Sequence, residues 1–148
     1  MIMLIPPEEA ELFFALYASV IGFAAGRSGD IEGVKDAATF RSAPNEVKAQ
    51  ARDHFLEHVD CLPGYLEQNP DRFGEQELSY FTHWSHLVQG NFIVERDLKK
   101  YTVFLTTDDR PKAYGVLGLT DEIADLVAYP LPMLVKAVLL PWKDRIIW

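Results

Sequence analysis

The sequence pattern that most restricts the fold lies at residues 91–107. Two runs rich in β-branched and aromatic residues flank a short segment, Leu98, Lys99 and Lys100. Such runs favour strands, and a short break between two of them is typical of an antiparallel hairpin. We expect Lys99 and Lys100 at an exposed turn. The side chains expected to be largely buried are Phe92, Val94, Val103 and Leu105.

The residues before this hairpin carry helical patterns, and those after it carry strand patterns. Predicted helices cover about 6–26, 44–61 and 75–88, with shorter pieces near 34–40 and 63–68. Gly26 and Gly90 are expected to end the first and third main helices. Predicted strands cover 112–119, 133–140 and 145–148, with a short helix from the N-cap Thr120 to about residue 127. Segregated helices and strands favour an α+β fold, with three main N-terminal helices packed on a mostly antiparallel sheet of about five strands.

The length of 148 residues suits one domain with one core. We therefore expect a single domain over 1–148, helical in 1–90 and sheet-forming in 91–148. The charge changes at the same place: residues 1–90 hold six basic and fourteen acidic residues, and residues 91–148 hold eight of each. An acidic surface repels phosphate backbones, so no nucleic-acid partner is expected.

Location is predicted from one apolar segment and one cysteine. The segment at 12–25 is 14 residues long, shorter than the roughly 20 that span a bilayer. Acidic residues precede it where a secretory signal needs basic ones. The single cysteine, Cys61, excludes an internal disulfide and suits a reducing compartment. We expect a cytoplasmic protein without membrane contact.

All four histidines lie in two close pairs. His54 and His58 are four residues apart and Cys61 follows three later, so the three share one face of a predicted helix, while His83 and His86 lie three apart on the next. If the two faces met, five nitrogen and sulfur ligands would suit a divalent transition metal. The alternative is that apolar residues hold the inward faces and the histidines are partly exposed and bind nothing.

Recognised catalytic motifs are few. Residues 54–58 match the H-x-x-E-H pattern of inverted zinc peptidases, but the downstream glutamate pair of those larger enzymes has no counterpart. The nucleophile elbow, the phosphate-binding loop and the dinucleotide fingerprint are absent from the sequence. Cys61 near His58 on an acidic helix is expected to be a protonated thiol. The catalytic residues and the reaction therefore stay unknown, and no cofactor beyond a divalent transition metal is considered.

Three segments of the second part carry a resemblance. They read LKKYTVFL at 98–105, YGVLGL at 114–119 and AVLLPWKDRII at 137–147. Together they resemble a group of uncharacterised prokaryotic proteins in which the chain continues past the final strand. The likeness covers about residues 75–148, consists of strand and turn residues and does not extend to either histidine pair. It supports the strand boundaries and implies no activity, cofactor or partner.

Two functional hypotheses follow. The first is a non-catalytic cytoplasmic interaction module that forms a homodimer or binds a protein partner through a sheet edge and exposed aromatic residues. Its motivation is the apolar end Ile146-Ile147-Trp148, which would leave a strand edge open unless another chain paired with it or more residues followed. The alternative for this end is a well-packed terminal strand. The second is a small metal-dependent enzyme, most plausibly a hydrolase, that uses the paired histidines with Cys61.

Overall fold

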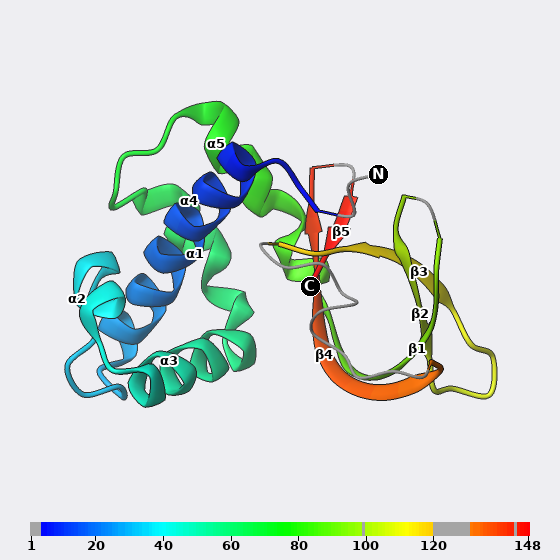
Figure 1. The fold of residues 1–148 in the computed structure, drawn as a ribbon. Coiled ribbons are helices and arrows are strands. Elements are labelled where there is room, and N and C mark those ends of the chain that lie inside the picture. Colours follow the sequence, from blue (N-terminus) through cyan, green and yellow to red (C-terminus); the bar gives the residue numbers. More distant parts are fainter. Residues whose placement is uncertain (1–3, 99, 120–130, 144) are drawn as a thin grey trace. The chain divides into compact units, whose positions relative to one another are not determined.

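A computed structural model describes residues 4–98, 100–119, 131–143 and 145–148. The fold is α+β, with helices followed by a five-stranded sheet, as predicted (Figure 1). The described residues form two compact units. The helical unit comprises Glu11–Ser85, and the barrel unit comprises the described residues up to Ala10 together with His86–Trp148. The predicted helix that begins at Thr120 lies outside the described residues.

The helices lie close to their predicted positions. Their bounds are α1 (Pro7–Ser28), α2 (Ala37–Ser42), α3 (Asn45–Glu57), η1 (Val59–Cys61), α4 (Leu62–Gln68), α5 (Glu75–Ser79) and η2 (Tyr80–His86). Helix α1 begins at a proline and has Glu8 and Glu9 in its first turn. Proline tolerates that turn because its missing N–H would be unpaired there, and acids favour the positive end of the helix dipole.

Helix α1 continues through the predicted terminator Gly26 to Ser28, and Gly29 takes the left-handed conformation with φ 72°. Gly22 and Gly26 instead allow the segment 35–37 to cross close to the helix. A Cβ on Gly22 would lie 2.3 Å from the carbonyl carbon of Asp36, and one on Gly26 would lie 2.2 Å from the carbonyl oxygen of Lys35. Only glycine leaves room for such a backbone approach.

Helix α1 is also the one described element that is long and apolar enough to cross a membrane. It exceeds the apolar segment expected from the sequence because it extends from Pro7 to Ser28. In the structure, 56% of its most apolar window is buried among other residues of the protein. The core helix of a soluble protein meets the same criteria of length and composition.

Both later main helices are shorter than predicted. Helix α3 ends at Glu57, because His58 leaves the helical backbone with φ −129° and ψ 38°. The third predicted helix becomes α5 followed by the 3₁₀ turns of η2, and its predicted terminator Gly90 lies inside strand β1. Strand pairing explains this difference, since Val88, Gln89 and Gly90 all pair with β4. Tertiary pairing therefore overrides the local helical pattern.

The core of the helical unit is aromatic. Phe81 contacts Tyr65 and Trp84 with ring centroids 5.0 and 4.8 Å apart, and Phe13 lies 5.4 Å from Trp84. All four residues are buried. Because they come from α1, α4 and η2, these rings join elements that are far apart in the sequence.

The five strands close into a barrel in the order β1-β2-β3-β5-β4 (Figure 1). They are β1 (Val88–Asp97), β2 (Thr102–Thr106), β3 (Ala113–Leu117), β4 (Met133–Trp142) and β5 (Arg145–Ile147). Every pair is antiparallel except β3 with β5. Five-stranded Greek-key barrels, the OB-fold among them, host many kinds of ligand, so this architecture assigns no function.

Of the two alternatives for the apolar end 146–148, an open strand edge and a packed terminal strand, the structure shows the packed strand. Ile146 pairs with Val116 of β3, and Ile147 pairs with Leu140 of β4. Strand β5 therefore has a partner on each side, and closure of the barrel removes free edges from its described strands.

Three of the four residues expected to be buried in the hairpin are buried, namely Phe92, Val94 and Val103. Leu105 is only half-buried, and Phe104 occupies the core instead. The alternation of side chains in β2 explains this, because inward Phe104 forces Leu105 outward. A register shift between Val94 and Arg96 changes which residues face each other across the hairpin. Lys100 is exposed as expected, and Lys99 lies outside the described residues.

The start of the chain completes the barrel unit. Leu4 forms an isolated parallel bridge with Gly118, and the Ile5 N–H donates to the Gly118 carbonyl at 3.2 Å. In the first turn of α1, the Glu9 carboxylate pairs with Lys143 and with Arg145, the latter at 3.1 Å. Segments at opposite ends of the sequence therefore belong to one unit.

Candidate functional site

Three of the five predicted metal ligands line one pocket of the helical unit. This pocket has a volume of about 300 Å³ and lies where the end of α3 meets the end of α1. Its lining residues are Ala24, Arg27, Ser28, His54, His58, Asp60 and Cys61. The fold brings the first histidine pair and the cysteine to one pocket, although the continuous helix predicted to carry all three ends at Glu57.

The two imidazoles of this pocket stack on each other. Their ring centroids are 4.3 Å apart, and the planes differ by 22°. His58 Nδ1 lies 2.7 Å from the His54 carbonyl oxygen. A carbonyl only accepts hydrogen bonds, so Nδ1 of His58 carries a proton, and Nε2 holds the lone pair of the neutral ring.

His54 is the least satisfied polar residue of the pocket. Its side chain is 9% exposed, and neither ring nitrogen has a hydrogen-bond partner among the described residues. The Asp30 carboxylate lies nearby, with its Oδ2 3.7 Å from His54 Nε2. This separation is too long for a hydrogen bond. A buried polar group without a partner costs about 1–3 kcal/mol, so this ring indicates a water, an ion or a ligand.

Cys61 is buried, and burial is the main cause that raises the pKa of its thiol. The negative charge of Asp60 raises that pKa further. Both causes favour the protonated thiol, which is a poor nucleophile and a poor metal ligand. The expectation of a protonated thiol agrees with this environment, although the acidic helix is the smaller of the two causes.

The second histidine pair does not line this pocket. His83 and His86 both lie on η2, but His83 belongs to the helical unit and His86 to the barrel unit. Across residues 4–98, 100–119, 131–143 and 145–148, no group of three histidine, cysteine, aspartate or glutamate side chains could hold a metal ion as it stands. The structure therefore does not assemble the predicted five-ligand set.

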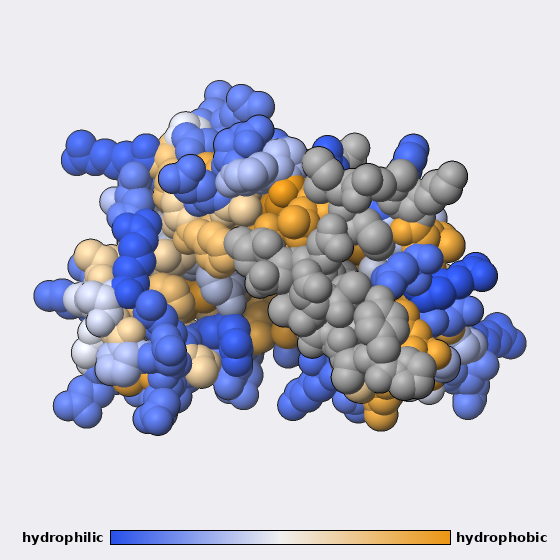
Figure 2. Space-filling view, in the orientation of Figure 1, coloured by the Kyte–Doolittle hydropathy of each residue, from blue (hydrophilic) through white to orange (hydrophobic). Residues whose placement is uncertain are grey.

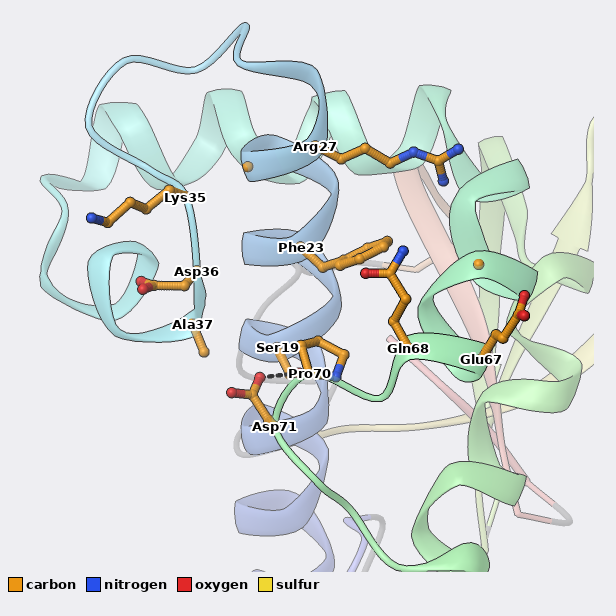
Figure 3. Close-up of a pocket in the computed structure, with 12 residues that line it drawn as sticks. Ser19, Phe23, Arg27, Lys35, Asp36, Ala37, Glu67, Gln68, Pro70 and Asp71 are labelled. Carbon is orange, nitrogen blue, oxygen red and sulfur yellow. Dashed lines mark hydrogen bonds between the residues drawn. The ribbon is translucent and has the colours of Figure 1, made fainter.

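A larger cleft, of about 610 Å³, lies along α1 in the same unit (Figure 3). Buried Ser19 of α1 hydrogen-bonds the hydroxyl of buried Tyr65 and the carboxylate of exposed Asp71. Burial raises the pKa of Tyr65 to about 12, so this phenol stays protonated and donates a hydrogen bond to Ser19. Ser19 in turn donates to Asp71. Ser19 lies on α1, Tyr65 on α4 and Asp71 on the loop after α4. The hydrogen bonds of this trio therefore link α1 to α4 and to that loop.

The sequence reasoning missed this trio. Its one signal was Ser19, a hydroxyl within the apolar segment 12–25. A buried hydroxyl needs a partner, but a single sequence does not reveal which distant residue supplies it. Charged and polar residues also line the cleft, and most of them are exposed, including Arg27, Lys35 and Glu67.

The outer face of the barrel carries a row of apolar side chains. Ile93 of β1 pairs with Leu105 of β2 and with Leu134 of β4, and Leu105 pairs with Ala113 of β3. Paired residues in antiparallel strands point to the same face, so the four form one apolar row. Leu134 is 65% exposed. Figure 2 shows hydrophobic residues at the surface of the barrel, at the lower right.

Comparison of the chain with protein-family models, with curated proteins and with solved structures finds no match. No relative therefore supplies a substrate, a partner or a set of functional residues. Function has to be inferred from the geometry of the apolar row, the histidine pocket and the cleft.

Proposed function

We propose that the protein is a non-catalytic interaction module that forms a homodimer through the apolar row of its barrel. The observation that supports this most is the exposure of Leu134 in register with Ile93 and Leu105. Among the described residues, four large hydrophobic side chains are exposed, and three of them, Leu98, Tyr101 and Leu134, belong to the barrel unit.

Burial of this row would supply the driving force. Complete burial of one leucine side chain contributes roughly 1.5–3 kcal/mol, and Leu134 keeps most of its area in water. Ile93 and Leu105 are half-buried and would add smaller contributions. A closed barrel offers no strand edge, so two copies would pack face to face. A two-fold axis then places the same row on both sides of the contact.

Charge favours the barrel over the helices as the contact between two copies. Residues 1–90 carry all of the net charge of −8, whereas basic and acidic residues balance in 91–148. Two helical surfaces would therefore repel each other, and two barrel surfaces would repel less. The same acidic surface is why the proposal includes no nucleic-acid partner. The proposal also includes a cytoplasmic location, where a lone cysteine remains reduced.

The test measures molar mass by light scattering across a range of protein concentrations. Wild type should shift from monomer to dimer as concentration rises, and Leu134→Glu should remain a monomer. Lys136→Gln is the matched control, because Lys136 is an exposed residue two positions along the same face of β4, and it should dimerise like wild type. A wild type that is monomeric at every concentration, or a Leu134→Glu variant that dimerises normally, would refute the proposal.

The small metal-dependent hydrolase remains the weaker candidate. Only the unpartnered ring of His54 favours it, and the predicted ligands are divided between two units. Metal analysis of protein purified without an affinity tag tests it. Retention of a transition metal together with hydrolytic activity that a chelator abolishes would support the enzyme over the interaction module.

A further inference from the structure

The buried imidazole of His54 has no hydrogen-bond partner among the described residues, which indicates that something binds there. His54 lines a pocket with room for an ion and its water ligands, its side chain is nine-tenths buried, and both ring nitrogens are buried. Trp84 also has a buried nitrogen without a hydrogen bond, but its indole can only donate, so it cannot bind a cation. An imidazole nitrogen with a free lone pair can do so.

Asp30 lies where it could share an ion with His54. Zinc binds imidazole nitrogen and carboxylate oxygen at about 2.0–2.2 Å. Two such ligands around one ion are about 3.4 Å apart at a tetrahedral angle and about 4.2 Å apart when opposed. The observed separation of 3.7 Å between His54 Nε2 and Asp30 Oδ2 falls between these values.

The loop that carries Asp30 is held in place locally. The backbone N–H of Asp30 donates to Ser28 Oγ at 3.1 Å, and the Ser28 hydroxyl donates to the Ala25 carbonyl at 3.3 Å. These bonds fix the loop to the end of α1, while the Asp30 side chain stays 70% exposed and free to adjust.

His58 has the arrangement that a third ligand needs. Ligating histidines usually donate their other ring N–H to a carbonyl or carboxylate, which fixes the tautomer. The bond from His58 Nδ1 to the His54 carbonyl does this and leaves Nε2 for an ion. His58 is exposed and lines the pocket just after the end of α3, so its side chain can shift while this hydrogen bond is kept. Such a shift is required, because no three described ligands are yet grouped around one point.

The charges around the pocket favour a cation. Acidic Asp60 lines the pocket, acidic Asp30 lies beside His54, and the C-terminal end of α1 adds the negative end of its dipole. Arg27 opposes them with one positive charge. Two imidazoles with one carboxylate suit a first-row transition ion, whereas magnesium and calcium prefer sites made of oxygen ligands alone.

From this geometry we propose that His54, His58 and Asp30 bind one divalent first-row transition ion, with Zn²⁺ as the expected occupant. The set differs from the one that the sequence suggested, because Asp30 enters and Cys61, His83 and His86 leave. The proposal is independent of dimerisation through the barrel. It requires no catalytic step, since an ion here would join the loop after α1 to the end of α3.

The test titrates Co²⁺, and then Zn²⁺ in competition, into untagged protein, following cobalt absorbance and heat of binding. We expect one ion per chain. Asp30→Asn and His58→Gln should each weaken binding by more than about a hundredfold, which exceeds the roughly 10–100-fold usual for residues behind the ligands. Asp30 and His58 are exposed, so loss of binding in these variants would not reflect loss of folding. His54→Gln should abolish binding, provided that circular dichroism shows a folded chain.

The matched control is the double variant His83→Gln with His86→Gln, which removes the other histidine pair and should bind like wild type. Failure of Co²⁺, Zn²⁺ and Ni²⁺ to bind wild type would overturn the proposal. Equal binding by wild type and Asp30→Asn would do the same. A strong near-ultraviolet band from thiolate bound to cobalt would also contradict it, because that band would make Cys61 a ligand.

Discussion

Replacement of Gly22 by alanine tests how closely the segment 35–37 crosses α1. The added Cβ would lie 2.3 Å from the Asp36 carbonyl carbon and 2.6 Å from the Ala37 nitrogen. Carbon atoms in contact are normally about 3.5–4.0 Å apart, so the crossing backbone would have to retreat by about 1 Å or more. That backbone is held in place, because the Asp36 side chain accepts a bond of 2.8 Å from the Thr39 N–H at the start of α2.

The magnitude of the effect follows from two opposing contributions. Overpacking of a tight contact costs typically 1–3 kcal/mol, and a backbone obstacle places Gly22→Ala toward the upper end. Alanine in a helix interior is favoured over glycine by about 1 kcal/mol, which offsets part of that cost. We therefore expect a loss of about 2 kcal/mol in the free energy of unfolding. At roughly 2–4 °C per kcal/mol for a chain of this size, the melting temperature should fall by about 4–8 °C.

Gly64→Ala is the matched control for this prediction. Gly64 also lies within a helix, α4, but its Cβ would meet only Arg27 Nη1 at 3.2 Å. The end of a long side chain can move away at little cost, so only the helix preference remains, and stability should rise by about 0.5–1 kcal/mol. Urea unfolding followed by circular dichroism measures both variants. If Gly22→Ala were as stable as wild type with an unchanged helix content, the close crossing would be disproved.

Two further predictions concern the buried hydroxyls. Asp71→Ala removes the acceptor of the Ser19 hydroxyl and should lower the free energy of unfolding in urea by about 1–3 kcal/mol. Asp71→Asn keeps an acceptor oxygen and should recover most of this loss. Equal losses in the two variants would contradict the assigned direction of the bond. Burial raises the pKa of Tyr17 and of Tyr65 to about 12, above the ordinary value of 10. The stability from these neutral phenols is complete below about pH 10 and is lost as the pH rises toward 12. A tyrosinate absorbance titration should show a late component that disappears in the double variant Tyr17→Phe with Tyr65→Phe, and an unchanged curve would contradict the assignment.

The sequence predicts the class of the fold well, because local patterns carry it. The proline and acids at 7–9 mark the start of α1, and the β-branched runs around 91–107 mark β1 and β2. Closure of the barrel is not predictable in this way. It depends on the pairing of β5 with both β3 and β4, and no local sequence pattern identifies those two strands as its partners.

The candidate site was predictable only in part. The spacing of His54, His58 and Cys61 predicts one face of a continuous helix. The helix ends at Glu57 instead, and the three residues line one pocket. Asp30 was missed because it lies on the loop after α1, with α2 between it and α3, and comes near His54 only through the fold. Gly26 was misread for a similar reason. A glycine that ends a helix and a glycine that admits a crossing backbone look the same in a sequence.

The division of the barrel unit along the chain affects the order in which the protein can assemble during synthesis. The ribosome delivers the N-terminal end first, and domains generally fold as units once they are complete. Ile5 emerges early, yet its hydrogen-bond acceptor Gly118 emerges more than a hundred residues later, and β1 has to wait for β4. Residues 11–85 are continuous and contain all the contacts of the helical unit, so that unit can form while the first strand of the barrel still lacks a neighbour. During that interval the nascent chain exposes the backbone of β1, which makes the hairpin region the segment that a chaperone has most reason to cover.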